Sequence, residues 1–113
     1  MSKLSEEVGV LIDLCFPMYK KISEYYVRHE GEQLFFDFVI DELNVAIEVQ
    51  GRQHYEFVPF FHRDSYYFYK QKKRDRLKKD WAEENGFYLV LVEEGMKLNK
   101  SKFLKVVQEA MDL

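Results

Sequence analysis

The spacing of apolar residues predicts a helix followed by three strands in the first half of the chain. Apolar residues recur at helical intervals over residues 4–15, and Pro17 ends this helix. Strand-forming residues dominate three later segments, at residues 21–27, 34–40 and 45–50. A turn over residues 28–33 and a short connection over residues 41–44 separate these strands, so the last two form a hairpin.

The second half of the chain predicts a long helix, an apolar strand and a final helix. Residues 64–85 follow a helical pattern that ends at Asn85 and Gly86. Residues 87–92 (FYLVLV) form an apolar run of strand length, which predicts a central strand of the sheet. The last helix is capped by Asn99 or Ser101. Its buried face carries Phe103, Leu104, Val106, Val107, Ala110 and Met111.

This order of elements predicts the α/β fold class. A hairpin followed by a strand–helix–strand crossover gives a mixed sheet with helices on both faces, plus a C-terminal helix. The 113 residues are expected to form a single domain over residues 1–113. A hydrophobic share of 47% is enough for one core and too high for a disordered chain.

Cysteine content and charge spacing bear on the cellular setting. Cys15 is the only cysteine, which excludes an intrachain disulfide and a cysteine-based zinc site. The longest stretch without a charged residue, 85–92, has eight residues, so no membrane span is expected. The N-terminus also lacks the basic-then-apolar layout of a secretion signal. We therefore expect a reducing, cytoplasmic setting, in a bacterial cell or a phage-infected host.

Charge is distributed unevenly along the chain. The net charge is −3, but residues 62–79 contain eight basic and two acidic residues. Such a segment can bind a polyanion locally, because electrostatic attraction acts within a Debye length of about 10 Å. The alternative is a solvated helix face, which is the usual role of a run of charges.

Two predicted strands each carry a carboxylate among apolar neighbours. Asp37 lies within 34–40 and Glu48 within 45–50, and the hairpin brings them close together on adjacent strands. Like charges at close range favour a divalent cation between them. Carboxylate oxygens, completed by a backbone carbonyl and water, suit Mg²⁺ or Mn²⁺. The alternative is a pair of acids at strand ends that point to solvent.

The same residues resemble the PD-(D/E)XK nuclease motif. Asp37 is followed by Glu48-Val49-Gln50, with Gln50 at the usual lysine position. The run through Gln53-His54-Tyr55 is similar to a branch of small phage and bacterial nucleases akin to very-short-patch repair and homing endonucleases. The predicted element order is also similar to the restriction-endonuclease-like αβββαβ core, and the resemblance covers the chain from about Glu7 to Val92.

The resemblance implies a set of metal ligands. Asp37 and Glu48 would bind the metal, with the Val49 carbonyl as a third ligand. Glu7 on the first helix matches an acid that many members place over the metal. Its neighbour Glu6 is the alternative. Glu7 is preferred because Val10 and Leu11 then fall at the offsets that bury the helix.

Further catalytic and DNA-binding roles follow from the same resemblance. Gln50 would orient the attacking water or the scissile phosphate, while Arg74 or Lys78 would supply the missing positive charge. His54 would act as a general base or contact phosphate, and its alternative is a locally bonded loop histidine. On the basic helix, Lys70, Arg74 and Lys78 share one face and Lys72, Arg76 and Lys79 share another. We expect DNA contacts from Arg52, Gln53, Lys70, Lys73, Arg74 and Lys78.

An aromatic tract adjoins the basic segment. It comprises Phe57, Phe60, Phe61, Tyr66, Tyr67, Phe68 and Tyr69. Three roles are possible for these aromatic side chains: packing in the core and loops, a dimer interface, and insertion into a distorted base step of DNA.

These observations together predict a Mg²⁺-dependent DNA endonuclease. Because no module for reading DNA sequence is present, we expect selectivity for branched DNA, as in Holliday-junction resolvases, and action as a homodimer. The spacing of Glu7, Asp37 and Glu48 is also similar to that of archaeal-type resolvases. The alternatives are a nicking endonuclease of the repair or homing type and a non-catalytic DNA-binding module on a nuclease fold.

Overall fold

A computed structural model describes residues 2–51 and 65–112. The elements, in chain order, are α1 (Lys3–Cys15), β1 (Ile22–His29), β2 (Glu32–Ile40), the 3₁₀ helix η1 (Asp41–Leu43), β3 (Val45–Gln50), α3 (Ser65–Glu84), β4 (Tyr88–Glu93) and α4 (Lys100–Ala110). This order confirms the predicted α/β class with its C-terminal helix. No helix among the described residues is long and apolar enough to cross a membrane.

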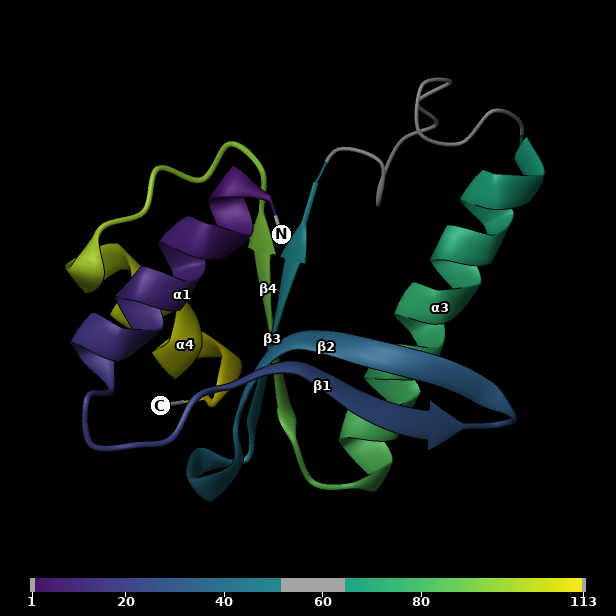
Figure 1. Ribbon diagram of the computed structural model, residues 1–113, viewed down its shortest axis with the longest axis horizontal. Coiled ribbons are helices and arrows are strands. Elements are labelled where there is room, and N and C mark those ends of the chain that lie inside the picture. Colours follow the sequence, from purple (N-terminus) through teal and green to yellow (C-terminus); the bar gives the residue numbers. More distant parts are fainter. Residues whose placement is uncertain (1, 52–64, 113) are drawn as a thin grey trace.

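The described strands form one mixed sheet in the order β1-β2-β3-β4. β1 with β2 and β2 with β3 pair antiparallel, while β3 and β4 pair parallel through the crossover that contains α3. α1 and α4 lie on one side of the sheet and α3 lies on the other (Figure 1). The sheet therefore separates two cores.

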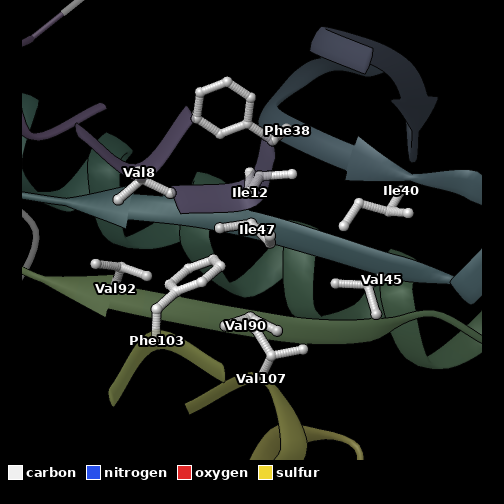
Figure 2. Close-up of a cluster of buried hydrophobic side chains, with 10 residues drawn as sticks. All are labelled: Val8, Ile12, Phe38, Ile40, Val45, Ile47, Val90, Val92, Phe103 and Val107. Atoms are coloured by element: carbon white, nitrogen blue, oxygen red, sulfur yellow. The ribbon is translucent and has the colours of Figure 1, made fainter. Parts of the chain in front are cut away.

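The core under α1 and α4, called the α1–α4 core, joins both helices to three strands. Figure 2 shows its ten buried side chains converging from α1, β2, β3, β4 and α4, namely Val8, Ile12, Phe38, Ile40, Val45, Ile47, Val90, Val92, Phe103 and Val107. Gly9 lets α1 approach this layer, because a Cβ atom there would lie 3.2 Å from Cζ of Phe38. An alanine at position 9 would require the Phe38 ring or α1 to shift by a few tenths of an ångström.

The core under α3, called the α3 core, is smaller and aromatic. Its buried members are Val27, Leu34, Phe36, Val39, Ala46, Leu77, Trp81 and Ala82. The Trp81 ring lies 5.2 Å from that of Phe36 and 5.1 Å from that of Phe87, measured between centroids. Tilted aromatic pairs at this spacing add packing energy beyond their buried area, so Trp81 anchors α3 to the β1–β2 hairpin.

β2 changes its packing partner partway along its length. Leu34 and Phe36 belong to the α3 core, whereas Phe38 and Ile40 belong to the α1–α4 core. Residues two apart on a regular strand point to the same face. The strand is therefore strongly twisted at Asp37, the residue between these two groups.

Two local predictions need correction. The turn expected over residues 28–33 has only two residues, Glu30 and Gly31. Both adopt positive φ values (48° and 78°), which form a tight turn between paired strands. The pairing of β1 with β2 therefore continues up to His29 and Glu32. The strand expected to be central, β4, lies at the edge of the described sheet. Val90 and Val92 are buried in the α1–α4 core, whereas Leu89 and Leu91 on the α3 side of β4 are half-buried.

Burial predicts different responses at two valines of α1. Val8 is fully buried and Val10 is 58% exposed, so the same change to alanine probes both environments. We expect Val8→Ala to lower the free energy of unfolding by about 2 kcal/mol, because it leaves a cavity. Val10→Ala should change it by less than about 0.5 kcal/mol. Urea denaturation measures both, and equal losses would contradict this packing of α1.

Candidate functional site

Asp37 and Glu48 lie where β2 separates from β3. The β2–β3 pairing ends at Phe38 and Ile47, and Asp37 and Glu48 would be the next pair in the same register. Here the side chains replace the missing backbone partners. The Asp37 N–H donates to Oε1 of Glu48 at 2.9 Å, and the Val49 N–H donates to Oδ2 of Asp37 at 2.8 Å. The two carboxylates are thus held together, as the hairpin predicts.

The backbone opposite Asp37 is also irregular. Ser23 pairs with Phe38 and Tyr25 with Phe36, but the register between them skips Glu24, which has a φ of 51°. A left-handed conformation costs a residue with a side chain roughly 1–2 kcal/mol. Such strain clusters at functional sites, where the surrounding structure maintains it. The irregularity therefore draws attention to the same point of the sheet as the carboxylate pair.

Lys78 of α3 completes the arrangement. Its Nζ donates to Oε2 of Glu48 at 2.8 Å, and the two side chains are 14% and 4% exposed. The ammonium also lies 5.8 Å from the centroid of the Phe36 ring. Both oxygens of Glu48 therefore have donors, which a buried carboxylate requires. Of Arg74 and Lys78, the structure brings Lys78 to the carboxylates.

Burial raises the pKa of Glu48 above its ordinary value. The neighbouring Lys78 ammonium opposes this shift by attraction and hydrogen bonding, while the charge on Asp37 adds to it. Glu48 therefore holds a proton up to a higher pH than a solvent-exposed glutamate does. A cation that approaches it would compete with a proton.

The Val49 carbonyl faces the same gap between the strands. The N–H and C=O of one residue in a strand point toward the same neighbouring strand. The Gln50 carbonyl accepts from the Glu94 N–H at 2.9 Å and so faces β4, whereas the Val49 N–H faces Asp37 on β2. Two carboxylates and this carbonyl form an all-oxygen donor set of the kind that Mg²⁺ and Mn²⁺ prefer.

Glu7 and Glu6 are not gathered with this pair. Both side chains are exposed, and Glu7 lines a separate apolar pocket with residues of α1 and of the segment after β4. Across residues 2–51 and 65–112, no three His, Cys, Asp or Glu side chains lie close enough to hold a metal ion. The reason given for preferring Glu7 was wrong, because α1 buries Ser5, Val8, Gly9 and Ile12 and leaves Val10 exposed.

The other predicted DNA contacts are dispersed along α3. Lys73 Nζ lies 3.6 Å from Oε1 of Glu32, so part of its charge is already neutralised. Lys70 and Arg74 are exposed, and Lys70 Nζ lies 5.6 Å from the centroid of the Tyr66 ring.

Six further residues named in the sequence analysis lie outside the described residues. They are Arg52, Gln53 and His54, and Phe57, Phe60 and Phe61 of the aromatic tract. Of that tract, Tyr66, Tyr67 and Tyr69 are exposed.

Three further basic residues of α3, which the sequence also marks as candidates for binding phosphate, lie together in the structure. Lys72, Arg76 and Lys79 line a pocket that Gln50 also lines. Their shared helix face was visible in the sequence. The position of β4 beside that face was not, because it depends on tertiary packing.

Comparison with known proteins found viral relatives. No protein-family model matches the chain. It is 36% identical over 69 residues to Uncharacterized protein 033L of Invertebrate iridescent virus 3, covering 61% of this chain and 36% of that protein. It is 34% identical over 99 residues to Uncharacterized protein 307L of Invertebrate iridescent virus 6, covering 79% and 50%. Uncharacterized protein 094L of Frog virus 3 (isolate Goorha) is 38% identical over 74 residues, covering 58% and 48%.

The chain thus spans half or less of the length of these relatives. Their names state no activity. The functional interpretation therefore depends on the geometry of the carboxylate pair and on the motif that contains it.

Removing Lys78 should make stability depend more strongly on pH. In Lys78→Met, the pKa of Glu48 rises further because the neighbouring cation is lost. The unfolded chain then releases this proton at lower pH than the folded chain, so the free energy of unfolding falls as pH rises above about 4.5. We expect a loss near pH 8 of about 3 kcal/mol relative to wild type, with a smaller loss near pH 5.

Urea denaturation at several pH values measures this effect. The double variant Lys78→Met/Glu48→Gln should lose the added pH dependence, because no carboxylate is left without its partner. A pH-independent loss in Lys78→Met, or the same slope in the double variant, would contradict the pairing of Lys78 with Glu48.

Proposed function

We propose that the chain is a metal-dependent nuclease domain of PD-(D/E)XK type that hydrolyses phosphodiester bonds in DNA. The observation that carries the proposal is the pair Asp37 and Glu48, held together where β2 leaves β3, with the Lys78 ammonium 2.8 Å from Glu48. Mg²⁺ or Mn²⁺ is the proposed cofactor, and Asp37, Glu48 and the Val49 carbonyl are its proposed ligands.

The bound cation would lower the pKa of a water molecule and neutralise charge on the phosphate. The protein's residues would do the rest. Asp37 and Glu48 would hold the cation, and backbone N–H groups already orient one oxygen of each carboxylate. This arrangement holds the ligands ready before substrate binds.

Lys78 accounts for the departure at the third motif position. Gln50 cannot carry a positive charge, but α3 brings the Lys78 ammonium to the same carboxylate from the facing helix. The half-buried Gln50 side chain remains available to orient water or phosphate through its amide. Lys78 therefore takes the electrostatic role that the usual lysine would have.

Branched DNA is the proposed substrate and a homodimer the proposed assembly. The sequence resemblance to junction resolvases supports the first. The exposed Tyr66, Tyr67 and Tyr69, at 59%, 46% and 64%, support the second, since aromatic residues are enriched at protein interfaces. In the alternative of a nicking endonuclease, His54 would have the larger role and the protein would act as a monomer.

Cleavage of DNA in Mg²⁺ tests the proposed activity. Asp37→Asn should reduce the rate at least about a hundredfold, because it removes a charged ligand, and Lys78→Met should do so by about a hundredfold. Asp41→Asn changes an exposed aspartate of η1 in the same way and should leave the rate within about twofold of wild type. Wild-type protein that cleaves no DNA in Mg²⁺ or Mn²⁺, yet binds it, would support the alternative of a non-catalytic module.

The same assay compares a four-way junction, a mismatched duplex and a linear duplex of related sequence. We expect the junction to be cut fastest. Equal rates on all three would contradict selectivity for branched DNA while leaving the nuclease activity in place.

A further inference from the structure

A pocket of about 520 Å³ lies between α3 and β4, beside the end of β3. A volume of this size is within the range of small-molecule and cofactor sites. Its lining residues are Gln50, Lys72, Asp75, Arg76, Lys79, Leu89, Leu91 and Glu93.

The α3 side of the pocket is cationic. Lys72, Arg76 and Lys79 are exposed there, and they outnumber the two carboxylates in the lining. Within the part of the chain that the structure describes, Arg76 and Lys79 form no ion pair, in contrast to Lys73 and Lys78. With Asp75 and Glu93 in the lining, the pocket carries a net charge of +1. Arg76 and Lys79 can therefore still bind an anionic ligand, and phosphate is an anion that arginine binds well.

The β4 side of the pocket is apolar. Leu89 and Leu91 are alternate residues of β4 and are half-buried, while Val90 between them is fully buried in the α1–α4 core. Side chains two apart on a strand share a face, so the two leucines form a continuous apolar surface on the α3 side of the sheet. Such a surface suits the face of a nucleobase.

The pocket adjoins the carboxylate pair. Leu91 is the register partner of Glu48 across β3 and β4, and Gln50 follows Glu48 by two residues on the same strand face. A nucleic-acid strand held at Glu48 therefore has the pocket directly beside it.

We propose that this pocket, the nucleotide pocket, binds one unpaired nucleotide of the strand that lies at Asp37 and Glu48. Its base packs on Leu89 and Leu91, and its flanking phosphates pair with Arg76 and Lys79. A base stacked inside a duplex cannot reach the leucines, so the pocket selects unpaired or extruded nucleotides. The inference rests on the proposed nuclease function, for which it specifies the form of the substrate.

Binding of DNA without divalent cations tests the pocket separately from cleavage. The probe is a fluorescein-labelled eight-nucleotide single strand, measured by fluorescence anisotropy in EDTA at several salt concentrations and compared with a blunt duplex of the same sequence. We expect wild type to bind the single strand at least fivefold more tightly than the duplex. Arg76→Gln/Lys79→Gln should weaken single-strand binding about tenfold and reduce the slope of log K against log salt by about 1.4.

The matched control is Lys102→Gln/Lys105→Gln on α4, which removes the same charge from the opposite side of the sheet. This variant should bind within twofold of wild type. Leu91→Asp places a carboxylate on the apolar surface and should also lose at least tenfold, whereas Leu14→Asp on the exposed side of α1 should not.

The proposal would be overturned if Arg76→Gln/Lys79→Gln and Lys102→Gln/Lys105→Gln lost equal affinity for the single strand. Tighter binding of the duplex than of the single strand by wild type would also overturn it. Because binding is read in EDTA and cleavage in Mg²⁺, failure of the nucleotide pocket and failure of the nuclease function give different results.

Discussion

The functional interpretation depends on how the protein stabilises Glu48 inside the sheet. A buried carboxylate beside a second carboxylate is unfavourable unless donors surround it. The separation of β2 from β3 frees backbone N–H groups at the required point, and α3 delivers Lys78 from across the α3 core. The same separation holds the two carboxylates against each other's backbone, Glu48 at the Asp37 N–H and Asp37 at the Val49 N–H. One local irregularity thus creates both the electrostatic problem and the carboxylate pair on which the proposed cation site rests.

The two cores have distinct roles in holding this irregularity. The α1–α4 core fixes β3 and β4 through side chains such as Ile47 and Val90, so the strand that carries Glu48 has little freedom. The α3 core draws the β1–β2 hairpin toward Trp81 and so twists β2 at Asp37. The position of Lys78 follows from the same packing, because Leu77 and Trp81 orient α3.

The sequence predicted the fold and the carboxylate pair because both follow from local patterns. The hairpin between residues 34–40 and 45–50 has a short connection, which sets Asp37 opposite Glu48. Glu7 was misplaced for a tertiary reason, since the close approach at Gly9 selects which face of α1 meets the sheet. The sequence marked Lys72, Arg76 and Lys79 as basic residues of one helix face, but it did not predict the pocket that they line. That pocket depends on β4 lying beside α3, which no spacing along the chain reveals.

The most direct test of this account is calorimetric titration of Mn²⁺ into the wild-type chain, into Asp37→Asn and into Asp41→Asn. The account predicts one binding event in the wild type and in Asp41→Asn, and none in Asp37→Asn. Binding should also weaken as pH falls, because a proton on Glu48 competes with the cation. The absence of a binding event in the wild type, or an unchanged event in Asp37→Asn, would contradict a cation site at Asp37 and Glu48.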